Sequence, residues 1–408
     1  MITSTVSNKE IWRIACPIML GNLAQTIITF TDTAFLGHLG TNELSASMMA
    51  GLYYFVFTTL AMGFAVGIQI FIARRFGEGD YKRIGVVFQH GAHFVLALGI
   101  LLFCILFFFS HRLLEVIIDS PNIQVAANEY LSIRQFGIFF DYALIFGNAG
   151  LPEMGMGGAA LASLLAEVTA FCFFWIYTYI KIPHEEYGMF RWHKKEPQLL
   201  ADLLKVAFPC MIQRLFSFGA WFIFFVMIEK MGETAIGVSS VVRSTYMILI
   251  IPGIAFASTS NTLTSRIIGE GKSNEVMASI WKVVKNSLLC SAVLVAVVAA
   301  IPHLVLQIYT DDLALAQAAI PSVYVICVAT LLGAFSMTFF EAVSGTGNTT
   351  AAMALEFGIL IIYIIYVFLM SKTSTIAGVW TAEWVYNILI GLISLVYIWK
   401  ADWGRKRI

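Results

Sequence analysis

Long apolar segments, each bounded by charged or turn-forming residues, recur along almost the whole chain. Most are close to the ~20 residues that an α-helix needs to cross a bilayer, whereas barrel strands are about half as long and alternate apolar with polar residues. The pattern predicts an all-α polytopic membrane protein with about 10–12 transmembrane helices. The predicted spans are 11–36, 44–72, 84–109, 155–180, 199–229, 235–262, 280–309, 314–340, 350–370 and 376–399.

Composition supports this class and excludes others. The 408 residues are 59% hydrophobic and 12% charged, with a mean hydropathy of +0.82, values that soluble domains do not show. The net charge is zero, so we expect no nucleic-acid partner. The sequence has no GxxxxGK[ST] nucleotide motif and no Ser/His/Asp or HExxH arrangement. We therefore expect a protein that is not an enzyme, and an ion gradient rather than ATP as the energy source.

Candidate metal ligands are few. His90 and His93 are three residues apart on one helical face, but no third ligand is in view, so we interpret them as helix-packing residues. The six cysteines lie scattered in apolar segments without CxxC spacing and predict neither a disulfide framework nor a metal site. We expect no metal and no organic cofactor.

Basic residues predict the orientation. Of the 25 lysine and arginine residues, 18 lie in alternate connections between the predicted spans, all on one side. By the positive-inside rule, both termini and the polar linker 183–198 are cytoplasmic. We expect a multi-pass protein of the inner cell membrane.

The chain contains an internal repeat. At an offset of 192 residues, 13 of 63 positions are identical between residues 17–79 and 209–271. The shared residues include Pro17 with Pro209, Gly40 with Gly232, Arg74 with Arg266, and Gly77-Glu78-Gly79 with Gly269-Glu270-Gly271. Both copies start from the predicted cytoplasmic side, so the repeats are parallel, an arrangement known from secondary transporters. This predicts an N-terminal lobe at 1–182, the linker 183–198 and a C-terminal lobe at 199–408.

The two copies differ in length. From Gly158, which aligns with Gly378, the offset is 220, so the first copy lacks 28 residues between about Tyr130 and Gly158. A single crossing by the remnant at 128–147 would place the basic linker outside. We therefore predict that the remnant does not span and forms a re-entrant or surface-lying hairpin. The alternative is a deleted or misassembled gene whose product is impaired.

Several motifs in this order resemble the multidrug and toxic compound extrusion (MATE) family of secondary transporters. They are P-x14-D-x4-G-x2-G at 17–40, ARRFGEGD at 73–80, DYALIFG at 141–147 followed by GMGGAALAS at 155–163, and SGTGNT at 344–349. The resemblance covers essentially the whole chain. It implies two six-helix lobes around a central cleft, and export of organic cations and other amphipathic compounds in exchange for H⁺ or Na⁺.

The resemblance also implies a cation-coupling site in the N-terminal lobe. Asp32 corresponds to the family's first-helix carboxylate, Asp141 to the aspartate of its N-x3-D motif, and Ser163 to an associated hydroxyl residue. Gly137 stands where the family has the asparagine, so the sequence departs from an intact Na⁺ cage. The C-terminal lobe has Phe224 at the repeat position of Asp32. The early part of span 199–229 lacks the glutamate of one family branch, which favours a proton-coupled branch.

Further charges lie inside the predicted spans. Isolated charges are costly in lipid, so we expect them to face a cleft or to pair across helices. Glu356, Glu383 and Arg243 are candidates for the substrate cleft, and Glu383 stands at the repeat position of Ser163. The alternative is that the two glutamates pair structurally with Arg243 or Arg214.

The sequence thus predicts an antiporter that exports amphipathic, cationic small molecules by alternating access, with H⁺ or Na⁺ as the coupling ion and Asp32 as the carboxylate that binds it. Its partners are small-molecule substrates and the lipid bilayer, and we expect a monomer. Two alternatives stay open: a lipid-linked saccharide flippase of the same superfamily, and a degenerate, non-transporting membrane protein.

Overall fold

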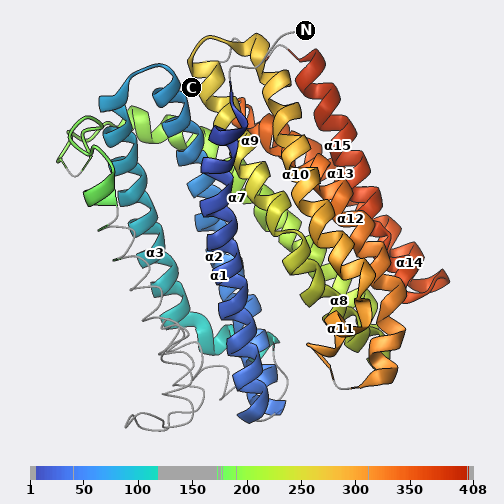
Figure 1. Cartoon of the computed structure of the whole chain (residues 1–408). Coiled ribbons are helices and arrows are strands. Elements are labelled where there is room, and N and C mark those ends of the chain that lie inside the picture. Colours follow the sequence, from blue (N-terminus) through green and yellow to red (C-terminus); the bar gives the residue numbers. More distant parts are fainter. Residues whose placement is uncertain are drawn as a thin grey trace. The chain divides into compact units, whose positions relative to one another are not determined.

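The computed structural model describes residues 6–39, 41–117, 172, 176, 178–189, 191–310, 312–401 and 403, and for 28–57 and most of 102–117 it describes the backbone alone. Apart from one 3₁₀ turn, the regular elements within these ranges are α-helices (Figure 1). They are α1 (Asn8–Leu39), α2 (Thr41–Gly77), α3 (Tyr81–Ile117), α7 (Pro197–Glu229), α8 (Glu233–Leu249), α9 (Ile251–Gly269), η2 (Ser273–Glu275), α10 (Val276–Ala300), α11 (Pro302–Gln307), α12 (Leu313–Gly345), α13 (Thr349–Thr373), α14 (Ile376–Trp380) and α15 (Ala382–Lys400).

The predicted helical class is confirmed. Among the described residues, seven helices are long and apolar enough to cross a membrane, or up to eight if the bent pair α8 and α9 counts as one span. The remnant at 128–147 and most of the predicted span 155–180 lie outside the described residues, so those two predictions stay predictions.

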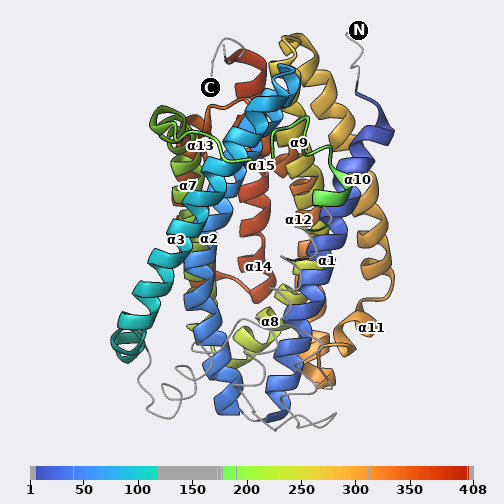
Figure 2. The same ribbon diagram turned by 90° about the vertical axis from the view of Figure 1, so that its left-hand side faces the viewer.

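Two predicted spans are wrong as single helices. The span 235–262 is broken at Ile250, where α8 and α9 bend by 44°, and Pro252, which has no backbone N–H to donate, lies in the first turn of α9. The span 280–309 stops at Ala300, and Pro302 begins α11. The predicted span 376–399 is confirmed by the candidate span Ile376–Lys400, within which α14 ends and α15 begins at Thr381 (Figure 2).

The described helices divide into two compact units. The C-terminal unit contains Met1–Leu23, Gly63–Val87 and Glu196–Ile408, and the N-terminal unit contains Ala24–Met62 and Phe88–Lys195. The first part of α1, the end of α2 and the start of α3 thus belong to the C-terminal unit. The predicted boundaries at 182 and 199 stay a prediction.

In the C-terminal unit, α12 is the central helix. It packs against α8, α9, α10, α13 and α15, and 61% of its most apolar window is buried, more than in any other described span. α10, α12, α13 and α15 run side by side (Figure 1). The helix α7 packs against α13, and these helices together enclose the polar side chains described below.

The repeated glycine turns meet in this unit. Gly77 ends α2 and Gly269 ends α9, and each lies against the backbone of the other's turn. A Cβ atom at Gly77 would lie 3.1 Å from the Glu270 nitrogen, and one at Gly269 would lie 3.1 Å from the Glu78 nitrogen. The Cβ atom at Gly77 would lie even closer to the carbonyl oxygen of Arg266, and the one at Gly269 even closer to the carbonyl oxygen of Arg74. The same contact, made twice by repeat-related residues, leaves no room for a side chain in either copy.

Polar side chains also join α2 to α9. The Gln69 amide donates to the Ser258 carbonyl (3.1 Å) and to the Thr262 hydroxyl (2.6 Å), and the Ser265 hydroxyl donates to the Ile70 carbonyl (2.7 Å). These bonds hold together helix ends that the glycines allow to approach.

Candidate ion-coupling site

The predicted N-terminal site lies largely outside the described part of the chain. Asp32 belongs to the helix α1, but the structure describes only its backbone. Asp141 and Ser163 lie outside the described residues. The coupling role of these three residues therefore stays a prediction.

Glu356, on α13, is a buried carboxylate in the C-terminal unit, with only 3% of its surface exposed. Its Oε1 atom accepts two hydrogen bonds, from the Ser217 hydroxyl of α7 (2.6 Å) and from the Tyr386 hydroxyl of α15 (2.8 Å). Its Oε2 atom is buried and has no hydrogen-bond partner among the described residues. The Oε2 atom can therefore accept a hydrogen bond from a further donor.

Glu383, in the first turn of α15, is a second buried carboxylate, 7% exposed. Its two oxygens accept hydrogen bonds from the Tyr363 hydroxyl of α13 (3.0 Å) and from the Tyr246 hydroxyl of α8 (3.2 Å). Its position near the N-terminus of α15 places it where a helix dipole favours negative charge.

The two carboxylates are linked by a reciprocal exchange of tyrosines between α13 and α15. Tyr363 of α13 bonds Glu383 of α15, and Tyr386 of α15 bonds Glu356 of α13. The rings of Tyr363 and Tyr386 are in edge contact, with centroids 6.0 Å apart. The two carboxylates are thus connected through the contact between the rings of their tyrosine donors.

The arginines that could have paired with these glutamates have other neighbours. Arg214 forms an ion pair with Glu341 of α12 (3.4 Å), and Glu341 also accepts a hydrogen bond from Asn261 (2.9 Å). Arg243 lies over the ring of Phe225, 5.5 Å from its centroid. No direct ion pair of Glu356 or Glu383 with Arg214 or Arg243 occurs among the described residues, and the direct partners of both glutamates are neutral side chains. Arg214 acts on Glu356 only through its charge.

Sequence reasoning missed the hydroxyl donors. Ser217, Tyr246, Tyr363 and Tyr386 lie far from their glutamates in sequence or on a different helix, so helical spacing gave no warning of the contacts. A weak signal was present, because each of α13 and α15 carries a glutamate and a tyrosine spaced to share a helical face, seven residues apart in α13 and three apart in α15. The role of Glu356, Glu383 and Arg243 in a substrate cleft stays a prediction.

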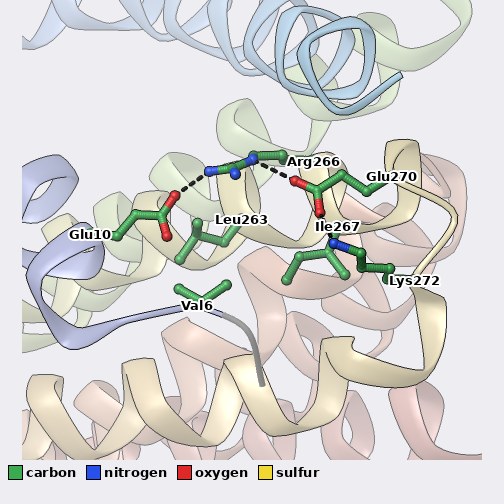
Figure 3. Close-up of a pocket in the computed structure, with 7 residues that line it drawn as sticks. All are labelled: Val6, Glu10, Leu263, Arg266, Ile267, Glu270 and Lys272. Atoms are coloured by element: carbon green, nitrogen blue, oxygen red, sulfur yellow. Dashed lines mark hydrogen bonds and ion pairs between the residues drawn. The ribbon is translucent and has the colours of Figure 1, made fainter. Parts of the chain in front are cut away.

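A small charged pocket lies at the end of α9 (Figure 3). Arg266 bridges Glu10 of α1 and Glu270, and Glu270 also bonds Lys272 at 2.9 Å, which raises the pKa of the lysine. The pocket measures about 140 Å³, below the roughly 300–1,000 Å³ of ligand pockets. We interpret it as an ion-pair cluster that fastens the start of α1 to α9, rather than as a substrate site.

Comparison with known proteins identifies the family. The MatE family model matches residues 17–176 and 209–369, two stretches that begin one repeat offset apart. The chain is 26% identical to a "Probable multidrug resistance protein NorM" of Agrobacterium fabrum over 378 residues, covering 83% of this chain and 78% of the relative. A protein of the same name from Thermotoga maritima is 24% identical over 449 aligned positions, covering 98% and 94%.

That second alignment is longer than this chain, so the relative has residues that the chain lacks. Among solved structures, an outward-facing multidrug resistance MATE family transporter of the MOP superfamily superposes with a TM-score of 0.86 at 19% identity, over 95% of this chain and 94% of that one. This likeness shows the two-lobed helical fold. Since the family model matches more than half of the chain, this multi-pass membrane protein belongs to the MATE family of multidrug efflux transporters.

Proposed function

We propose that the chain is an antiporter that exports amphipathic, cationic small molecules in exchange for H⁺ or Na⁺. The observation that carries the proposal is the presence of carboxylates inside membrane-spanning helices, where they are expensive and typically mark ion and substrate pathways. Asp32 lies within α1, and Glu356 and Glu383 are buried within α13 and α15. The matched multidrug resistance relatives support efflux of small molecules as the transport activity.

In this mechanism, Asp32 binds the coupling ion from outside, and its neutralisation favours the conformation that releases substrate. Exchange requires only that ion and substrate have opposite preferences for the two conformations. The protein acts as a monomer, both termini face the cytoplasm, and the lobes alternate in exposing the site to either side of the membrane.

The test is export of a fluorescent organic cation from proteoliposomes under an imposed pH gradient, an imposed Na⁺ gradient, or neither. We expect a gradient to drive export, and Asp32→Asn to reduce the gradient-driven rate about tenfold. Glu233→Gln is the matched control, because Glu233 is an exposed carboxylate at the start of α8.

Two outcomes would replace the proposal. Movement of a labelled saccharide lipid between leaflets, without gradient-driven export of cations, would favour the flippase. No transport of either kind by correctly inserted protein would favour the degenerate, non-transporting alternative.

A further inference from the structure

We propose that Glu383 and Glu356 form a second proton-binding site, in the C-terminal unit, at the place that the internal repeat makes equivalent to the predicted Asp32 site. The inference rests on the proposed antiport for its role in transport. Its physical basis is the internal repeat and the geometry of the C-terminal unit.

The repeat brings the relevant positions together. Phe224 stands at the repeat position of Asp32, and Glu383 at that of Ser163. In the C-terminal unit, Tyr363 contacts both of these residues. Its ring stacks on that of Phe224, with centroids 6.3 Å apart, and its hydroxyl donates a hydrogen bond to Glu383. The C-terminal copy thus has an aromatic ring where the N-terminal copy has its carboxylate, and a carboxylate where the N-terminal copy has its hydroxyl.

Charged and titratable groups lie on each of the helices packed around the pair. They are Cys210 and Arg214 on α7, Arg243 and Tyr246 on α8, Glu341 on α12, Tyr363 on α13 and Tyr386 on α15. Arg214 is engaged by Glu341, and Arg243 lies over Phe225. Every described hydrogen bond to the carboxylates of Glu356 and Glu383 comes from a neutral side chain: a serine or tyrosine hydroxyl in each case, and for Glu383 also the indole of Trp221. The charges of Arg214 and Glu341 both act on Glu356, with opposite signs.

This setting suits a proton. Burying a carboxylate without a paired cation costs free energy, and a bound proton removes the charge. A hard metal cation needs several oxygen ligands, but both hydroxyls near Glu356 point at Oε1, and Oε2 has no described hydrogen-bond partner. Oε2 of Glu356 is the atom that gains the proton.

The reciprocal tyrosines couple the two carboxyl groups. Loss of a proton from Glu356 strengthens the hydrogen bonds from Ser217 and Tyr386, because charged acceptors bond more strongly than neutral ones. Tyr386 is on the helix that carries Glu383, and its ring touches Tyr363, the donor to Glu383. The site therefore behaves as a coupled pair whose protonation state alters the packing of α13 against α15.

The experiment measures protonation directly, on the purified full-length protein, by infrared difference spectroscopy between acidic and alkaline pH. We expect a C=O stretching band of protonated carboxyl groups that loses intensity in Glu356→Gln and in Glu383→Gln. Tyr363→Phe keeps both carboxyl groups and removes one hydrogen bond, so it shifts the band instead of removing it. Glu233→Gln, at an exposed carboxylate, leaves this part of the spectrum unchanged.

Transport supplies the second readout. In Glu383→Gln we expect gradient-driven export to fall about tenfold, while exchange of substrate for substrate, which moves no net proton, continues. An unchanged infrared band in both glutamine variants overturns the second site, whatever the transport result. The opposite case is also distinguishable. If the glutamine variants lose the band but the wild-type protein exports no cation, the proton site stands and the proposed function is overturned.

Discussion

The turn after α2 and the turn after α9 keep the same residues, whereas the C-terminal parts of α1 and α7 do not. Gly77 and Gly269 occupy equivalent positions in the two repeats, and each lies in close contact with the backbone of the other's turn. Asp32 and Phe224 are also repeat partners, but one is a carboxylate and the other is a fully buried aromatic ring.

The difference has a physical origin. Where two backbones touch, neither copy can accept a side chain, so both glycines are fixed by the same contact. Phe224 is constrained by neighbours within the C-terminal unit, among them Trp380 at 4.9 Å and Tyr363 at 6.3 Å between ring centroids. Duplicated structure is therefore kept where the copies meet, and the chemistry diverges where each copy packs alone.

The largest expected effect on stability comes from removing the buried ring of Phe224. Phe224→Ala removes a ring that is 0% exposed and leaves a cavity beside Trp380, which we expect to lower the free energy of unfolding by about 3 kcal/mol. The measurement is chemical unfolding of the detergent-purified protein. Phe222→Ala is the control, since Phe222 is 49% exposed and leaves no cavity. Equal losses in the two variants would show that Phe224 is not a packing centre.

A smaller effect is expected at the repeated turns. Gly77→Ala and Gly269→Ala each place a methyl group against backbone atoms that cannot rotate away, at a cost of about 2 kcal/mol. The control is Gly219→Ala in α7, where no atom lies within 4 Å of the added carbon and alanine favours the helix by about 1 kcal/mol. The melting temperature should fall in the first two variants and hold or rise in the third. A harmless Gly77→Ala would show that the two turns do not touch in the membrane.

Sequence reasoning predicted the helical class and most of the long helices, because hydrophobic length is a local signal, and duplicated glycines revealed the repeat. It predicted one helix at 235–262 because apolar residues continue through Ile250, and only the position of Pro252 hinted at the bend. The family resemblance carried the assignment further than periodicity could.

The partners of the buried carboxylates were not predictable in the same way. Tyr246 reaches Glu383 across 137 residues, and Ser217 reaches Glu356 across 139, so no helical spacing encodes either contact. Charge alone offered Arg214 and Arg243 as the alternative partners. In the structure, hydroxyl groups from neighbouring helices donate to the glutamates instead. Which donors reach them depends on how α7, α8, α13 and α15 pack together.

The smallest effect distinguishes two arginines that the repeat makes equivalent. Arg74 is 4% exposed and donates to the Thr346 carbonyl (2.9 Å) at the C-terminal end of α12, where a cation also favours the helix dipole. Arg266 has a side chain 30% exposed and bonds Glu10 and Glu270. We expect Arg74→Ala to cost about 2 kcal/mol, because it leaves a buried carbonyl without its donor, and Arg266→Ala about 1 kcal/mol or less.

Salt separates the two contributions. Exposed ion pairs weaken as ionic strength rises, so unfolding in high salt should shrink the cost of Arg266→Ala and leave that of Arg74→Ala nearly unchanged. The measurement is the difference in unfolding free energy from wild type at low and at high salt for each variant. If both costs shrink alike, Arg74 acts through its charge and not through its buried hydrogen bond. The two equivalent arginines would then both stabilise the fold through their charge. Of the two repeat-related pairs, only Asp32 and Phe224 would differ in their chemical role.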